Sequence, residues 1–259
     1  MPNSTVNELK KRIVIAAYRA GEGHLASAFS ILDILYVLYN QVLKPEDYFV
    51  LSKGHASLAL YAVLADKGVI PREWLDHFTE YNSPLGGHPD RNKIPGVVFS
   101  TGSLGHGLPQ AVGLALALKV QKKPGRVYCL IGDGECNEGA IWEALLLAYE
   151  HELTNLVVIV DNNHSNDRAL NLRFLPDKFR TFGYFTIFIP GHEHSKIAAA
   201  CFTYDCDYPI AIIAETLKGK GCKRMEDNPE WHHKTPNRSE LNEILAELDN
   251  FENSANGVV

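Results

Sequence analysis

The run Gly132-Asp133-Gly134-Glu135 combines residue types that could hold a phosphate and a metal ion. It follows RVYCLI (126–131), an apolar segment typical of a buried strand. Glycines at the end of such a strand let backbone N–H groups approach a phosphate closely. The phosphate would repel an aspartate there unless a cation lay between them. Mg²⁺, held by few carboxylates plus phosphate oxygens, fits that place.

A second polar run, Asp161-Asn162-Asn163, follows the next apolar segment, NLVVIV (155–160). The 27 residues between Gly134 and Asn162 fit one crossover helix and a return strand. Because neighbouring parallel strands end at the same sheet edge, we expect Asp133 and Asn163 to lie together there. Both supply oxygen ligands for a metal. The ordinary alternative is a pair of βα turns with no ligand.

Helical and strand patterns alternate along the chain, which predicts an α/β fold. Continuous apolar strands favour a parallel β-sheet covered by helices on both faces. We expect strands over 47–51, 126–131, 155–160, 184–189 and 209–214, and helices over 9–20, 27–40, 56–66, 108–121, 139–150, 195–201 and from Ser239, a candidate cap. Thr5 and Glu8 have the spacing of a capping box. The glycine- and proline-rich segment 81–107 predicts a long ordered loop, and such loops are usually functional.

Composition excludes several classes of protein. The 259 residues are 46% hydrophobic and carry a net charge of −6, which argues against nucleic-acid binding. Five cysteines, an odd number without C-x-x-C spacing, argue against a disulfide framework or zinc site. No signal core and no apolar run of about 18 residues is evident in the sequence. We expect a cytoplasmic protein that does not bind membranes, folded as one domain over 1–259.

The spacing of the two polar runs resembles that of thiamine diphosphate (ThDP) enzymes, and other segments resemble the N-terminal half of transketolase in the family's order. The matching segments cover roughly 8–236: Gly23-His24 before a helix, LSKGHA (51–56), GHP (87–89), PG (95–96), STGSLG (100–105), EG and WEA (138–144), TLKGKG (216–221) and Trp231-His232. The resemblance implies the ThDP-binding fold of that family.

The resemblance also implies roles for individual residues. Asp133, Asn163 and the backbone carbonyl of Ser165 would bind Mg²⁺, for which Ca²⁺ or Mn²⁺ can substitute. The cofactor would be bound by Gly102, Leu104, Gly132, Asp133, Gly134, Glu135, Asn163, His55 and His232. His24, His55, His88 and His232 would surround the reactive carbon, where imidazoles can donate or accept protons. Glu138 would lie at a contact between subunits. We expect the remaining histidines to be surface or loop residues, except that the roles of His106 and His164 stay open.

The resemblance implies a missing partner. The pyrimidine-binding domain of the family has no counterpart here, so we expect it on a separate C-terminal transketolase-like chain, in an α₂β₂ heterotetramer. Two departures bear on the substrate: the family's GHPG is Gly23-His24-Leu25-Ala26, and the run after the metal asparagine is the polar HSNDR (164–168). They point to an unusual sugar or keto acid.

Three functions follow as alternatives. The first is transfer of a two-carbon ketol unit from a ketose or ketose phosphate to an aldehyde. The second is another ThDP reaction, such as decarboxylation of an α-keto acid with acyl transfer. The third is a non-catalytic regulatory paralogue, against which the intact metal and histidine residues argue.

Overall fold

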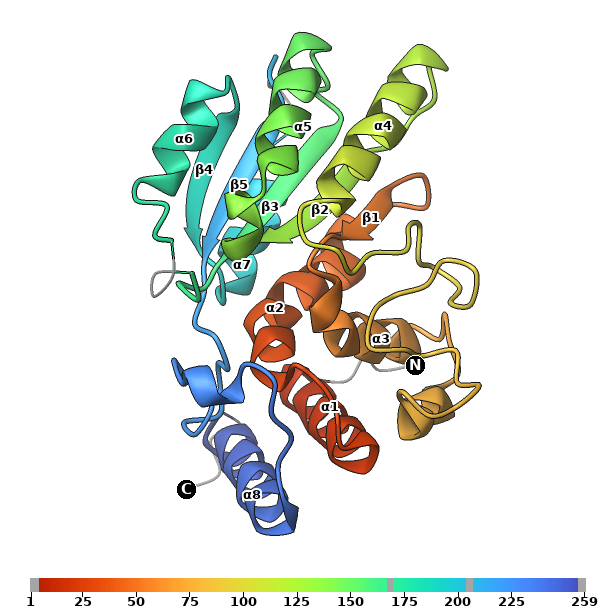
Figure 1. Ribbon diagram of the computed structural model, residues 1–259, viewed down its shortest axis with the longest axis vertical. Helices are drawn as coiled ribbons and strands as arrows, with labels where there is room; N and C mark the ends of the chain where they lie inside the picture. Colours follow the sequence, from red (N-terminus) through yellow and green to blue (C-terminus); the bar gives the residue numbers. More distant parts are fainter. Residues whose placement is uncertain (1–4, 167–169, 204–206, 256–259) are drawn as a thin grey trace.

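A five-stranded parallel sheet forms the centre of the computed structural model, which describes residues 5–166, 170–203 and 207–255 (Figure 1). The strand order is β1-β2-β3-β5-β4. The strands are β1 (Tyr48–Leu51), β2 (Val127–Gly132), β3 (Leu156–Asn162), β4 (Phe185–Pro190) and β5 (Ile210–Glu215). Each expected strand is present, with no end shifted by more than two residues.

Helices cover both faces of the sheet, as the continuous apolar strands predicted (Figure 1). One face packs against α4 (Gly107–Val120), α5 (Gly139–Glu150) and α6 (Leu175–Thr181). The other packs against α2 (Leu25–Val37) and α7 (His194–Cys201), with α1 (Val6–Ala20) and α3 (Ser57–Asp66) behind α2. Alternate strand residues enter the two cores: Val158 faces the first set of helices and Ile159 the second. The sheet thus has no face open to solvent over its central strands.

The register of the central strands decides where the polar runs emerge. Gly132 pairs with Asp161, and Asn162 pairs with Glu215. Asp133 follows directly, and its N–H donates to the Asp161 carbonyl (3.1 Å). The carboxyl ends of β2, β3 and β5 therefore form one edge.

Residues 81–107 connect the 3₁₀ turn Arg72–His77 to α4 as an ordered loop, as predicted. The loop is tied to α3 by two hydrogen bonds, from the Ser57 hydroxyl to the Gly87 carbonyl (2.9 Å) and from the Tyr61 hydroxyl to the Gly86 carbonyl (2.9 Å). Cys129, Cys136, Cys201 and Cys222 are buried free thiols; Cys206 lies outside the described residues.

The α2 helix corrects the expectation about apolar length. With the π-helical turn Leu38–Val42 it forms an 18-residue stretch, Leu25–Val42, long and apolar enough to cross a membrane by length and composition. Most of that stretch is buried between the sheet and the α1 and α3 helices. Burial on all sides is what a central helix of a globular core shows.

Two helix starts test the capping predictions. The Thr5–Glu8 capping box before α1 is formed in both directions. The last helix, α8 (Arg238–Ala255), begins one residue before the expected Ser239. Its cap is Asn237, whose side-chain oxygen accepts the Glu240 N–H (3.0 Å) while the Glu240 carboxylate accepts the Asn237 N–H (2.9 Å). Residues 256–259, expected to fray, lie outside the described part.

We expect Asn237→Ala to lower the free energy of unfolding by about 1 kcal/mol, because the Glu240 N–H at the start of α8 loses its side-chain acceptor. The matched control is Ser239→Ala, which removes only an exposed contact to Glu243 (3.2 Å). Urea unfolding of both variants measures the difference. Equal costs for the two would show that Asn237 does not cap the helix.

Candidate functional site

Asp133 and Asn163 lie at the shared edge of β2 and β3, each just beyond its strand. The Asp133 carboxylate accepts the Gly134 N–H (2.8 Å) and, more weakly, the Asn166 N–H (3.4 Å). Burial, and next the negative charge of Asp161, raise the pKa of Asp133. A buried carboxylate with a second carboxylate near it is a place where a cation would be favoured.

The amide of Asn163 is oriented by buried acceptors. Its Nδ2 donates to the Asp161 carboxylate (2.8 Å) and to the Ser30 hydroxyl (3.2 Å). The Asn163 side-chain oxygen therefore faces away from Asp161, and it accepts the Ser165 N–H (3.0 Å) and the Ser165 hydroxyl. One carboxylate, one amide oxygen and a nearby backbone turn form an oxygen donor set of the kind that Mg²⁺ accepts when phosphate oxygens complete it. The residues present fit the metal that the sequence predicted.

Asp161 itself is buried and points into the protein. It accepts hydrogen bonds from the hydroxyls of Ser30 (2.7 Å) and Thr216 (2.5 Å), and it pairs with the Lys53 ammonium. Burial by itself would raise the pKa of Asp161, but the Lys53 charge and these hydrogen bonds outweigh it, and the pKa is lowered. Asp161 is thus a charged support for Asn163.

Two buried lysines bring positive charge to the site, and the sequence reasoning missed both. Lys53 lies beneath Gly132, and Lys218 contacts His232 through its Nζ (2.8 Å from Nδ1). Burial, and next the charge of Lys53, lower the pKa of Lys218 to about 8. Their position inside the LSKGHA and TLKGKG segments was the available signal. Lys53 is paired with Asp161, so Lys218, which contacts the His232 ring, is the lysine that favours binding of an anion such as a phosphate.

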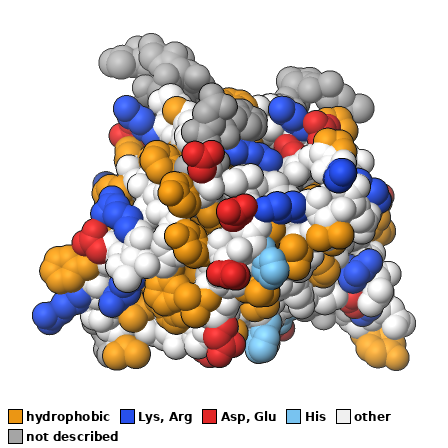
Figure 2. All heavy atoms as spheres, turned by 90° about the horizontal axis from the view of Figure 1, so that it is seen from above, with side chains coloured by type: hydrophobic (Ala, Val, Ile, Leu, Met, Phe, Trp, Pro, Cys, Tyr) orange, Lys and Arg blue, Asp and Glu red, His pale blue; other side chains and the backbone are white. Residues whose placement is uncertain are grey.

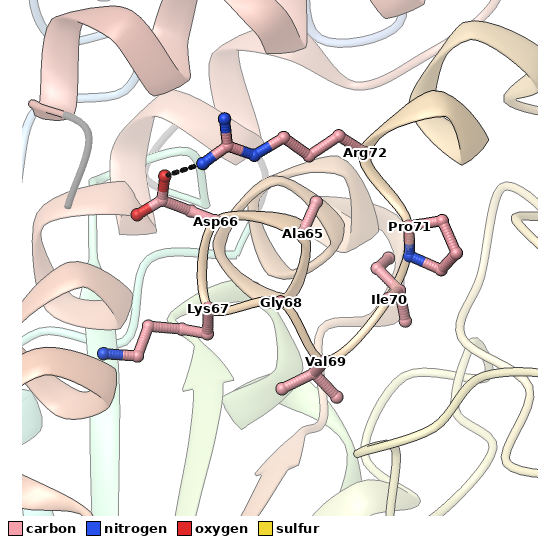
Figure 3. A pocket seen from close by; sticks show the side chains of 8 residues that line it. All are labelled: Ala65, Asp66, Lys67, Gly68, Val69, Ile70, Pro71 and Arg72. Atoms are coloured by element: carbon pink, nitrogen blue, oxygen red, sulfur yellow. Dashed lines mark ion pairs between the residues drawn. The ribbon is translucent and has the colours of Figure 1, made fainter. Parts of the chain in front are cut away.

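A cavity of about 180 Å³ opens beside these groups. It is lined by Asn163, His164, Ser165, Lys218, Asp227, Asn228, Pro229 and His232. A larger one, about 880 Å³, lies at the far end of α3 around Ala65–Arg72 (Figure 3). There the ionic groups pair with each other, as Asp66 does with Arg72 (3.5 Å) and with Arg12 (3.3 Å). We therefore place the functional site at the smaller cavity.

Three of the predicted histidines form a cluster. The ring centroids of His24 and His55 lie 5.2 Å apart, those of His24 and His232 5.6 Å, and those of His55 and His232 6.2 Å. His24 precedes α2, His55 lies in the 3₁₀ turn Gly54–Ala56 after β1, and His232 follows the 3₁₀ turn Pro229–Trp231. Residues far apart in the chain thus meet at one point.

The cluster is electrically neutral at neutral pH. Burial, and next the charges of neighbouring histidines, lower the pKa of His24 to about 4. Burial and then the Lys53 charge lower the pKa of His55, and burial and then the Lys218 charge lower that of His232. A neutral imidazole has one donor and one acceptor nitrogen, so the cluster suits hydroxyl and carbonyl groups.

The fourth predicted histidine, His88, is exposed and lies on the Thr101–Gly102 backbone. A Cβ added at Gly102 would lie 3.1 Å from the His88 ring. The Thr101 hydroxyl donates to the Leu51 carbonyl (2.6 Å), which ties this loop to the end of β1. Leu104, two residues on, is 38% exposed and available for contact with a ligand.

Glu135 is placed differently from the other predicted cofactor residues. Its buried carboxylate accepts the Ser52 hydroxyl (2.7 Å), the Gly105 N–H (2.9 Å) and the Gly132 N–H (3.0 Å). Burial raises the pKa of Glu135. Both carboxylate oxygens serve internal donors, so Glu135 joins three loops of the site to each other. Glu138 lies against Gly105, where an added Cβ would meet its side chain at 2.6 Å.

Several of the histidines expected to be surface or loop residues take part in internal contacts. His192 and His194 both bond the buried Asp33 carboxylate (2.9 and 2.8 Å), and His192 Nε2 accepts the Leu217 N–H (2.9 Å). Burial would raise the pKa of Asp33, but these histidine hydrogen bonds hold it well below its usual range. His233 stands beside His24, with ring centroids 4.5 Å apart.

The other histidines are exposed. His77, His106 and His151 face solvent, and His164 pairs with Glu215. Asp167 and Arg168, part of the polar run after the metal asparagine, lie outside the described residues. The face seen from above in Figure 2 carries hydrophobic, acidic and basic side chains among each other, and no field of basic side chains gathers among the residues coloured there. That face does not resemble a nucleic-acid interface.

Comparisons with known proteins show what the chain is similar to. Residues 2–249 match the family model described as transketolase, thiamine diphosphate binding domain. The chain is 36% identical over 255 residues to a subunit of the apulose-4-phosphate transketolase of Phocaeicola vulgatus, covering 92% of this chain and 90% of that protein. It is 37% identical over 254 residues to the protein of the same name from Actinobacillus succinogenes, covering 92% of each.

A solved structure has the same fold. Transketolase from Campylobacter jejuni matches with a TM-score of 0.85 at 28% identity, covering 97% of this chain and 45% of that one. The chain therefore spans less than half the length of that transketolase.

Proposed function

Because this chain belongs to the transketolase family through its thiamine diphosphate binding domain, we propose that it is the cofactor-holding subunit of a split transketolase. The enzyme transfers a two-carbon ketol unit from a ketose or ketose phosphate to an aldehyde. The observation that carries the proposal is a cavity lined by Asn163, Lys218 and His232. Asp133 lies at the same sheet edge as Asn163, and His24 and His55 cluster with His232. Groups that can bind a metal ion, a phosphate and a hydroxyl therefore lie close enough together to contact one ligand.

Each group has a distinct task in this proposal. Asp133 and Asn163 would hold Mg²⁺, while the Gly134 N–H and the Lys218 ammonium would meet the diphosphate. Bound thiamine diphosphate supplies the carbanion chemistry of the reaction. His24, His55 and His232, neutral at pH 7, would hold the hydroxyl and carbonyl oxygens of the sugar and move protons to and from them. Gly102 and Leu104 would line the thiamine, with His88 above them.

The pyrimidine-binding domain is proposed to be on a separate chain. The two relatives named as transketolase subunits are matched over nine-tenths of their length or more, whereas the single-chain transketolase is more than twice as long as the part that matches. We propose that residues 1–259 act as one domain, that the partner completes the cofactor site, and that the complex is a cytoplasmic α₂β₂ heterotetramer. The substrate is proposed to be a specialised sugar phosphate, which the Leu25-Ala26 and HSNDR departures support.

The test is ketose turnover with ThDP and Mg²⁺ by this chain alone and then with the pyrimidine-binding chain. Xylulose 5-phosphate and hydroxypyruvate are the donors, and ribose 5-phosphate is the acceptor. We expect turnover only in the mixture, with loss on removal of Mg²⁺ by a chelator and recovery when the ion is returned. Decarboxylation of pyruvate with no ketol transfer would instead indicate the α-keto acid reaction, and failure to bind ThDP in the mixture would contradict the proposal.

A further inference from the structure

His233 extends the histidine cluster outward. Its ring lies 4.5 Å from that of His24, at an interplanar angle of 34°. His24 and His55 are half-buried, whereas His233 is exposed. Burial lowers the pKa of His24 most, and the charge of His233 is the next largest cause. The two adjacent rings therefore extend the cluster from its half-buried part to the solvent.

The backbone that carries His233 is held on both sides. Trp231, two residues before it, is fully buried, and Asn228 caps the turn Pro229–Trp231. Lys234, the next residue, lies over the Trp231 ring (4.5 Å) and pairs with Glu240 at the start of α8 (3.0 Å). These contacts constrain the backbone on both sides of His233, and such preorganisation lowers the entropic cost of binding.

The chemistry of the cluster selects the kind of ligand group that His233 would meet. Among the residues that the structure describes, no three His, Cys, Asp or Glu side chains converge as a metal site. The neighbouring imidazoles are neutral and offer one donor and one acceptor each, the pattern that matches a hydroxyl group. A chain of hydroxyl-bearing carbons entering past His233 would meet one imidazole after another.

We propose that His233 is a specificity-determining residue that hydrogen-bonds a hydroxyl group of the donor ketose farther from the cofactor than the atoms reached by His24. It thereby favours ketoses of five or more carbons over three-carbon keto acids, which are too short to reach it. This inference rests on the proposed function.

The experiment compares two donors in the complex of this chain with the pyrimidine-binding chain. His233→Ala is expected to raise KM for xylulose 5-phosphate about 3- to 10-fold, the loss of one neutral hydrogen bond, with kcat nearly unchanged. KM for hydroxypyruvate should not change. His233→Asn, which keeps a donor and an acceptor, should recover part of the loss. His77→Ala, at an exposed histidine far along the chain, is the matched control and should alter neither donor.

The outcomes separate the inference from the function on which it rests. An equal change for both donors, or none for either, would overturn the role of His233 while leaving ketol transfer intact. Turnover of hydroxypyruvate alone by the unchanged complex would overturn it as well. If the unchanged complex turned over neither donor, the proposed function itself would fall, and the inference with it.

Discussion

Replacing Asp133 with asparagine is expected to abolish Mg²⁺- and ThDP-dependent turnover and yet leave the ligand-free protein at least as stable as before. Loss of activity should be at least about 100-fold, because a neutral amide cannot replace the carboxylate that the metal requires. Stability should hold or rise because the Asp133 carboxylate is buried near the negative charge of Asp161. Residues at functional sites often lower the stability of the ligand-free protein.

The sign of the stability effect follows from proton linkage. The folded pKa of Asp133 is raised above its unfolded value, first by burial and then by Asp161. The folded protein therefore binds the proton more tightly, and stability falls as pH rises from the ordinary aspartate pKa through the raised one. Above the raised pKa the ionised Asp133 destabilises the ligand-free state. Asparagine removes this contribution.

Thermal unfolding at pH 7, with and without ThDP and Mg²⁺, measures both halves of the prediction. The melting temperature of the unchanged chain in its complex should rise when the ligands are added, and that of Asp133→Asn should not change. Asp177→Asn, at an exposed aspartate on α6 that pairs with Arg180, is the control and should behave like the unchanged protein. A ligand-free Asp133→Asn protein that melts well below the control would contradict the argument.

Lys53→Met is expected to lower the free energy of unfolding by about 3–5 kcal/mol, because it leaves the Asp161 carboxylate buried without its counter-charge. The side chains of Lys53 and Asp161 are 3% and 0% exposed. Water therefore cannot replace the lost partner. The pKa of Asp161 is lowered despite burial, chiefly through the Lys53 charge, so the stabilisation is present above the ordinary aspartate pKa and is lost as pH falls through the lowered one.

Two further variants distinguish loss of charge compensation from loss of packing. Lys53→Met combined with Asp161→Asn should recover most of the stability, since position 161 then carries no charge that needs the Lys53 ammonium, and the Ser30 and Thr216 hydroxyls can still bond the amide. Arg19→Met, which breaks an exposed pair with Asp76, should cost no more than about 1 kcal/mol. Urea unfolding at pH 7 gives all three values. A double variant as unstable as Lys53→Met would mean that packing, and not charge, is responsible.

The local patterns of the sequence determined the sheet and most of its helices. Apolar runs such as 155–160 are interpretable without tertiary information because a strand covered on both faces needs apolar residues at every position. The Thr5–Glu8 capping box is likewise local, since both its hydrogen bonds span three residues. At the start of α8 the sequence indicated Ser239 as the candidate cap, whereas the structure has Asn237 in that role.

The joint position of Asp133 and Asn163 was also predictable from the sequence alone. It depends only on two strands being parallel neighbours that end at one edge, which their spacing along the chain requires. The family resemblance then supplied the expectation that His24, His55, His88 and His232 meet, and the structure brings His24, His55 and His232 together in one cluster. These inferences needed order and spacing, not side-chain packing.

The burial and the partners of the charged residues beneath the site could be found only from the tertiary structure. Lys53 meets Asp161 across 108 residues of sequence, and Glu135 joins Ser52 and Gly105 from two other loops. The sequence could not predict such partners, because whether a lysine or a carboxylate is buried depends on how the surrounding elements pack. The same reason applies to His192, expected to be a surface or loop residue, which bonds Asp33 on α2, and to His233, whose place beside His24 depends on the anchoring of Trp231 and Lys234. A polar residue has the same local pattern in a solvated loop as in a buried network, and only the three-dimensional packing distinguishes the two.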